Sequence, residues 1–112
     1  MPCIHIRTGK VEHRVNIEDF SYQLSQKMDI PIERMNVIVD YYEKTDVFIG
    51  RNTDFIIITL WVSEANEKEF IRNLAKTTAA LAEKYFHKKE KSAAVMCNLM
   101  REGYLFIHDQ FI

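Results

Sequence analysis

The chain lacks most of the residues that mark a specialised site or a disulfide framework. It has only two cysteines in 112 residues, Cys3 and Cys97, which is too few for a disulfide framework and does not form a metal motif. Each lies in a strand-like segment, so we expect both to be small buried hydrophobic side chains in a reducing compartment, with the cytoplasm as the location. With only three glycines, the sequence contains no glycine-rich phosphate loop, and it has no Gly-x-Ser-x-Gly nucleophile motif.

An excess of charge of one sign and long apolar runs are also missing. Fifteen Lys and Arg residues against sixteen Asp and Glu residues give a net charge of −1, so no overall field attracts nucleic acid or an anionic membrane. No apolar run approaches the ~20 residues of a membrane span, and His5, Arg7 and Lys10 argue against a signal peptide. The four histidines show no metal-ligand spacing. The sequence therefore predicts no metal, cofactor, nucleic-acid or membrane partner.

The chain does contain a repeated order of strand and helix patterns. Alternating or β-branched segments predict strands, and apolar residues at helical spacing predict two helices. The run Phe55–Val62 has almost no polar face, which is typical of a central strand covered on both sides. The expected strands are Cys3–Arg7, Met35–Tyr42, Phe55–Val62, Ala93–Met100 and, after a tight turn at Glu102-Gly103, Tyr104–Ile107.

The ends of the two helices carry recognisable signals. Asn16 is the expected N-cap of a first helix that begins at Ile17, and this helix must stop before Pro31, because a proline disfavours helical geometry in the residue before it. Asn66 and Glu69 have the spacing of a capping box in front of the second and longer helix, which ends near Tyr85.

Two β-α-β units therefore follow one another, at about residues 1–50 and 54–107, with an offset of about fifty residues. In this pattern Ile4 and Ile6 correspond to Ile56 and Ile58. We expect one α+β domain over residues 1–112, in which a four-stranded sheet carries both helices on one face. The other face also holds apolar residues, so we expect copies of the chain to cover it by self-association.

Pro2, directly behind Met1, allows two interpretations. If Met1 is removed, Pro2 becomes an N-terminal secondary amine that can act as a base near neutral pH. Alternatively, Pro2 only begins an edge strand, where its missing N–H does no harm.

Several segments together resemble the tautomerase superfamily, which includes 4-oxalocrotonate tautomerase and macrophage migration inhibitory factor. The resemblance rests on the start MP followed at once by a strand, on the strand–helix–strand repeat, and on the run DIPIERMNVIVDYYEKTDVFIG. The second half, with DFIIITLWVSEANEKEF and the tail REGYLFIHDQFI, is most similar to a branch without an assigned function.

This resemblance implies a homotrimer with active sites at the subunit edges and Pro2 as the catalytic base. The implied substrates are small 2-oxo or 2-hydroxy acids, whose carboxylate needs a cation. Arg14 is the best candidate in the first loop and Lys10 the second, although both can simply be solvated charges. The second arginine position of the family reads Asn36 here. Phe48 matches the family's aromatic residue near the Ile-Gly turn, although packing explains it as well.

Two functions follow from the resemblance. The first is a small tautomerase-like enzyme that uses Pro2 as general base in keto–enol proton transfer. The second is a non-catalytic trimeric binding or scaffold protein of the same fold, because a fold alone does not define a function.

Overall fold

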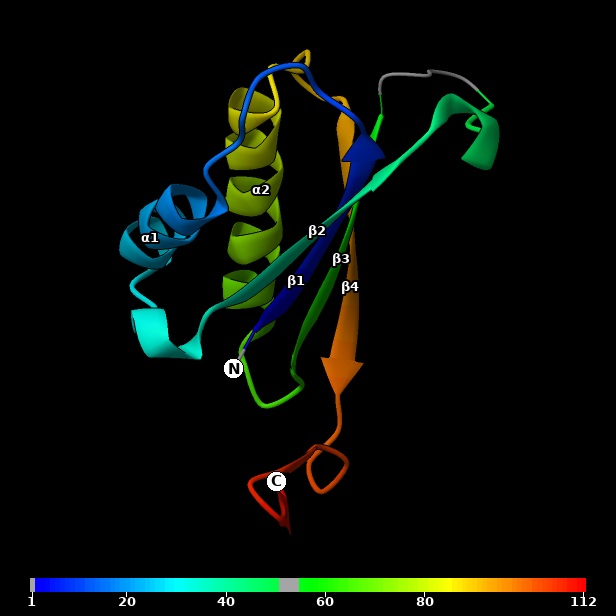
Figure 1. Cartoon of the computed structure of the whole chain (residues 1–112). Helices are drawn as coiled ribbons and strands as arrows, with labels where there is room; N and C mark the ends of the chain where they lie inside the picture. Colours follow the sequence, from blue (N-terminus) through cyan, green and yellow to red (C-terminus); the bar gives the residue numbers. More distant parts are fainter. Residues whose placement is uncertain (1, 51–54) are drawn as a thin grey trace.

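The chain alternates strands and helices in the order that the sequence predicts (Figure 1). The computed structural model describes residues 2–50 and 55–112. The expected removal of Met1 and the expected junction between the repeats, at residues 51–54, lie outside the described residues. The elements are β1 (Cys3–Gly9), α1 (Ile17–Met28), η1 (Ile32–Arg34), β2 (Asn36–Tyr42), η2 (Lys44–Asp46), β3 (Ile56–Ser63), α2 (Lys68–Tyr85), β4 (Ala93–Met100), β5 (Phe106–Ile107) and β6 (Gln110–Phe111).

The four long strands form one mixed sheet in the order β2-β1-β3-β4. β1 is parallel to β2 and β3 is parallel to β4, whereas the two central strands, β1 and β3, are antiparallel. Figure 1 shows α1 and α2 side by side on one face of this sheet. The predicted α+β fold is confirmed. Because the two parallel pairs run in opposite directions, the β1–β2 pair and the β3–β4 pair end at opposite edges of the sheet.

The core lies between the helices and the face of the sheet that they cover. Ile4 and Ile6 of β1 and Ile56 and Ile58 of β3 are fully buried, as strand alternation with one covered face requires. The helices contribute apolar stripes at helical spacing. Burial of each such side chain stabilises the fold by roughly 1.5–3 kcal/mol. The stripe residues of this core are Phe20, Leu24, Ile71, Leu74, Leu81 and Ala82.

The start of α1 is as predicted, and the start of α2 is not. The side chain of Asn16 accepts a hydrogen bond from the backbone N–H of Asp19 at 3.0 Å, which confirms it as the N-cap. The capping box of Asn66 and Glu69 is wrong. Glu67 occupies the N-cap position of α2 and makes no side-chain capping hydrogen bond within the described chain. The side-chain amide of Asn66 donates to the carbonyl of Ser63 at 3.1 Å.

The outer face of the sheet, opposite the helices, remains open in the single chain. β3 is a central strand, as predicted, but it is covered on one side only. Large apolar side chains remain exposed there, among them Ile38 and Met96. The prediction that both cysteines are buried is also wrong, because Cys97 is exposed on the edge strand β4 and Cys3 is half-buried. Cys97 is paired with the buried Leu60 and so belongs to the face that the helices cover, and it is exposed because β4 is the last strand of the sheet.

The last residues form a small separate hairpin below the sheet rather than a further sheet strand (Figure 1). The chain turns at Gly103, where a φ of +87° favours glycine. β5 then pairs with β6 through a two-residue turn in which His108 and Asp109 both have positive φ. The expected strand Tyr104–Ile107 is thus reduced to Phe106–Ile107, because its partner strand, β6, has only two residues.

Candidate active site

A cavity of about 900 Å³ lies at the edge of the sheet where β1 begins and β3 and β4 end. The antiparallel pairing of β1 and β3 creates this position, because it brings the start of the first repeat beside the end of the second. Cys3, the first residue of β1, lines the cavity and is paired with Trp61 of β3. The terminal hairpin supplies a further wall through Leu105, Ile107 and Ile112.

Pro2 is buried immediately before Cys3, at this edge of the sheet. Its carbonyl accepts a hydrogen bond from the side-chain amide of Asn36 at 3.4 Å, and the same amide donates to the carbonyl of Arg34 at 3.3 Å. Asn36, at the start of β2, therefore connects the segment of Pro2 to η1. Pro2 thus lies next in the chain to Cys3, which lines the cavity.

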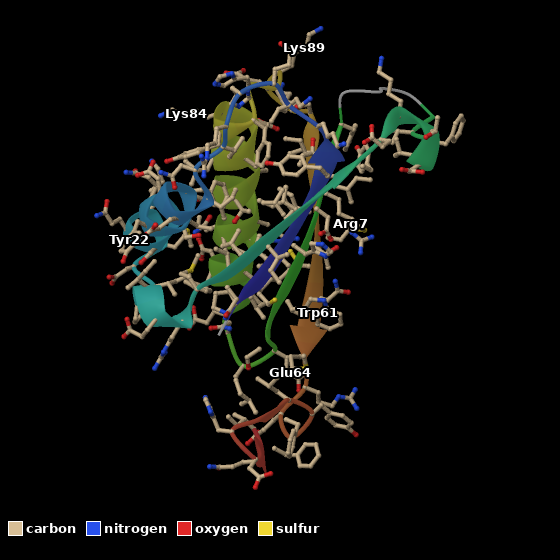
Figure 2. All side chains as sticks on the ribbon, in the orientation of Figure 1. Arg7, Tyr22, Trp61, Glu64, Lys84 and Lys89 are labelled. Atoms are coloured by element: carbon tan, nitrogen blue, oxygen red, sulfur yellow. The ribbon has the colours of Figure 1, made fainter. Side chains whose placement is uncertain are left out.

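Charged and apolar side chains both reach the cavity. Arg34 of η1 and Arg101, directly after β4, supply two guanidinium groups, and Glu64 and Glu102 supply two carboxylates. Trp61 lies at this end of the sheet and adds an aromatic surface (Figure 2). A guanidinium group is suited to bind a carboxylate through two parallel hydrogen bonds, so the cavity can hold a small organic acid.

The other site residues predicted from the sequence lie away from Pro2 in the single chain. Lys10 follows the far end of β1 and pairs with Glu43. About eight steps along an extended chain lead from Pro2 to Lys10, a span of roughly 26 Å at the usual rise of a strand. Phe48 belongs to the segment after β2 at that same far end and is 92% exposed. Arg14 is exposed in the loop between β1 and α1. The single chain therefore does not bring Lys10 or Phe48 to Pro2.

Arg34 and Arg101 were not among the residues predicted from the sequence. The sequence did contain an indication of Arg34. The family resemblance implies an arginine at position 36, which is Asn36 here, and Arg34 lies two residues before it. The signal for Arg101 is its place directly after a strand. It becomes informative only when the pairing of β3 with β1 is known, because this pairing brings the end of the second repeat to Pro2.

Two further features of the described chain bear on its chemistry. Across residues 2–50 and 55–112, no three His, Cys, Asp or Glu side chains gather closely enough to hold a metal ion. In the same ranges, no helix has both the length and the apolar character to cross a membrane.

Comparison with solved structures shows that this arrangement of sheet, helices and terminal hairpin is the fold of the tautomerase superfamily. A fused 4-OT solved as an asymmetric trimer superposes with a TM-score of 0.84 at 12% identity, over 97% of this chain and 94% of that chain. Pt0534, inactivated by 2-oxo-3-pentynoate, superposes with a TM-score of 0.82 at 11% identity, over 96% and 93% of the two chains.

Macrophage migration inhibitory factor from Oncomelania hupensis superposes with a TM-score of 0.74 at 9% identity, over 97% of this chain and 95% of that chain. No protein-family model and no curated protein sequence matches this chain. At these identities the likeness establishes the fold, which confirms the expectation from the sequence, and the chemistry has to be argued from the cavity.

Proposed function

We propose that this protein is a keto–enol tautomerase of small 2-oxo and 2-hydroxy acids, with Pro2 as the general base. The observation that supports this proposal most directly is the position of Pro2. It is buried directly before Cys3, which lines a cavity together with Arg34 and Arg101. The proposal requires that Met1 be removed, because only then is the nitrogen of Pro2 a basic amine.

The proposed reaction moves one proton and needs no other reagent. The nitrogen of Pro2 takes the proton from the hydroxyl of the enol. The C–O bond then becomes the carbonyl double bond, and the electron pair of the C–C double bond moves to the neighbouring carbon. The same nitrogen then delivers a proton to the neighbouring carbon, so substrate and product have the same composition. An α-amino group has an ordinary pKa of about 7.7–8.0, and burial disfavours its charged form. The pKa of the Pro2 amine should therefore lie below that range.

Arg34 and Arg101 are the proposed partners of the substrate carboxylate. Each belongs to the same end of the sheet as Pro2 in one chain, whereas Arg14 and Lys10 require a neighbouring subunit to bring them there. The apolar side chains of Trp61 and Leu105 are placed to hold the rest of a small acid and to exclude water. Phe48 can line the site only as a residue of a neighbouring subunit.

We also propose that the protein is a homotrimer. The open outer face of the sheet carries exposed apolar side chains from β2, β3 and β4, including Ile38, Trp61 and Met96, and burying such a face is favourable. The fused 4-OT proteins with this fold were solved as trimers. Self-association therefore accounts for a surface that the single chain leaves uncovered.

A second candidate function is a non-catalytic trimeric binding or scaffold protein. Asn36 favours it, because this residue stands where the family resemblance implies an arginine and its amide is used to bind two backbone carbonyls. Under this proposal the cavity binds a ligand, or serves only to pack subunits, and Pro2 has no chemical role.

The decisive experiment uses untagged protein whose loss of Met1 is verified by intact mass. It is assayed spectroscopically with enol acids such as phenylenolpyruvate and a 2-hydroxydienoate, beside a form that retains Met1. We expect ketonisation by the processed form only. Activity no higher than that of the Met1-retaining form would refute the enzyme and leave the scaffold protein.

Matched arginine variants then identify the cation. Arg34→Ala and Arg101→Ala should each weaken the use of acids by roughly ten- to a hundredfold, since a hydrogen bond to a charged group contributes ~1.5–3 kcal/mol. Neutral enols should be almost unaffected. Arg14→Ala and Lys10→Ala serve as comparisons. A loss confined to one of these two would show that the carboxylate is held from a neighbouring subunit.

A further inference from the structure

The four histidines of the chain differ in whether their imidazole rings have a partner. His5 of β1 pairs with Asp40 of β2. The rings of His13 and His87 stack on each other, with centroids 3.8 Å apart and planes 15° from parallel. The ring of His108 makes no hydrogen bond, ion pair or aromatic contact with any residue that the structure describes. Its two nitrogens are therefore available to a ligand.

The fold places this free imidazole at the cavity beside Pro2. His108 is exposed and lines that cavity together with Cys3 and Arg101. It occupies the first position of the two-residue turn between β5 and β6, in the terminal hairpin below the sheet (Figure 1). Ile107, the residue before it, lines the same cavity. The hairpin thus carries both an apolar and a polar side chain to the candidate site.

The hairpin turn itself does not call for an imidazole. His108 and Asp109 have φ values of +50° and +63°, and Asn-Gly is the pair that such a turn prefers, because both central residues need positive φ. A histidine at the first of these positions therefore adds nothing that closing the turn requires. Residues held in uncommon backbone conformations gather at functional sites, and here the unusual residue is also the one that reaches the cavity.

The other polar groups of the cavity are less suited to bind a neutral oxygen of a ligand. The two arginines are the proposed partners of the carboxylate, and the two glutamates repel an anionic ligand. The hydroxyl of Ser63 already accepts a hydrogen bond from the N–H of Ala65 at 3.1 Å. The thiol of Cys3 is a weak donor, and the indole of Trp61 can donate but cannot accept.

A neutral imidazole has the hydrogen-bonding capacity that both tautomers of a 2-oxo acid demand. The oxygen at C2 is a carbonyl acceptor in the keto form and a hydroxyl that also donates in the enol form. Neutral histidine carries one donor nitrogen and one acceptor nitrogen. His108 can therefore bind this oxygen in either form, whereas an arginine can only donate to it.

We propose that His108 is a specificity-determining residue, which binds the oxygen at C2 of the acid while an arginine of the cavity binds the carboxylate. This inference rests on the substrate class of the proposed function and names the group that distinguishes a 2-oxo acid from a simple carboxylic acid. A site that hydrogen-bonds a ligand oxygen disfavours the analogue without it. Because His108 is exposed, water replaces the lost hydrogen bond in part, so the discrimination is modest.

The test compares two acids that differ only at C2, 2-oxobutanoate and butanoate. Isotope-labelled full-length protein without Met1 is titrated with each acid, and the backbone amide resonances of Cys3 and Ala65 report binding in the cavity. We expect wild type to bind 2-oxobutanoate more tightly than butanoate by roughly three- to tenfold, the effect of one neutral hydrogen bond. The measured quantity is the ratio of the two dissociation constants.

Two glycine variants of the same turn make the test specific. His108→Gly removes the imidazole, and glycine accepts the positive φ, so the hairpin is retained. This variant should bring the ratio to about one by weakening the binding of 2-oxobutanoate alone. The matched control, Asp109→Gly, makes the same change at the neighbouring position, which is not among the cavity residues. It removes a negative charge and so affects both acids alike, which should leave the ratio as in wild type.

Equal binding of the two acids by wild type, or a ratio that His108→Gly does not change, overturns the proposal. An equal fall of the ratio in Asp109→Gly also overturns it, because the turn rather than the imidazole then governs the preference. These outcomes are distinct from those of the enzyme assay. Ketonisation by a wild type whose ratio does not depend on His108 refutes this inference alone. A ratio that depends on His108 without ketonisation refutes the enzyme and leaves the inference.

Discussion

Tyr85 joins three segments of the chain through three parts of one residue. Its hydroxyl donates a hydrogen bond to Asp19 in the first turn of α1, and its ring packs edge-on against Phe20 with the centroids 5.4 Å apart. Its backbone carbonyl accepts a hydrogen bond from Nε2 of His13 at 2.9 Å. Burial, followed by the hydrogen bond and the charge of Asp19, raises the pKa of Tyr85 to about 12. The folded chain thus favours the neutral phenol.

We expect this residue to make the stability depend on pH in the alkaline range. The pKa in the unfolded chain is about 10, so the stabilisation is complete below pH 10 and is lost as the pH rises through about 12. Tyr85→Phe keeps the ring but removes the titrating hydroxyl. The stability difference between wild type and variant should therefore be constant up to about pH 9 and shrink by about pH 11 in urea unfolding.

Tyr104→Phe is the matched control for this measurement, because Tyr104 is 70% exposed in the terminal hairpin. Its pH dependence should follow that of the wild type. If the difference between wild type and Tyr85→Phe stays the same over the whole range, the hydrogen bond to Asp19 does not govern the titration of Tyr85.

At the scale of single elements, the two helices differ in how their first turns are closed. Asn16 caps α1 through its side chain, and Asn66, which has a similar sequence context, does not cap α2. Asn16→Ala should therefore lower the free energy of unfolding by about 1 kcal/mol. Asn66→Ala should cost no more than ~0.5 kcal/mol, as for most surface substitutions. Chemical unfolding of both variants beside wild type measures the two costs, and equal costs would contradict the assignment of the caps.

The same pair of residues shows what the sequence can and cannot predict about elements. The ends of α1 follow from Asn16 and Pro31, because capping and the restriction before proline act over a few residues. The start of α2 does not follow in this way. Asn66 has two possible partners, and the carbonyl of Ser63 lies within reach only because β3 ends there. The pairing at the end of the chain was predicted wrongly for a related reason. The sequence suggested a turn at Glu102-Gly103 into Tyr104–Ile107, whereas β5 pairs with β6 through the turn at His108 and Asp109.

For the whole molecule, the proposed trimer leads to a direct test on the open face of the sheet. Met96 is 54% exposed on β4, and Tyr22 is 47% exposed on α1, in the other layer of the molecule. Figure 2 shows Tyr22 on the helix side, away from Trp61 and the sheet. Met96→Glu should convert a trimer into monomers, because a buried unpaired charge is costly. Tyr22→Glu should not change the assembly.

Light scattering coupled to size-exclusion chromatography reports the mass of each variant. A wild-type monomer at micromolar concentration would refute the trimer, and a trimer that survives Met96→Glu would show that this face is not the interface. Near-identical circular dichroism spectra of the two variants would exclude unfolding as the cause of a difference.

The candidate site could be predicted only in part, for a reason that belongs to the whole molecule. Pro2 could be proposed from the sequence because the chemistry of an N-terminal proline depends on its place in the chain. The cations depend on the sheet order, which places Arg34 and Arg101 near Pro2 and carries Lys10 to the far edge. The order of the strands along the sequence does not contain this information. It leaves open whether the central strands of the two repeats pair in parallel or antiparallel.

One feature of the fold also governs how the protein can be labelled. Pro2 and Ile112 lie at the same edge of the sheet, and Ile112 lines the cavity beside Pro2. We therefore expect an affinity tag, a dye or a surface tether attached at Ile112 to compete with a ligand in that cavity. The outer side of α1, at Tyr22, offers an exposed attachment point in the other layer of the molecule (Figure 2).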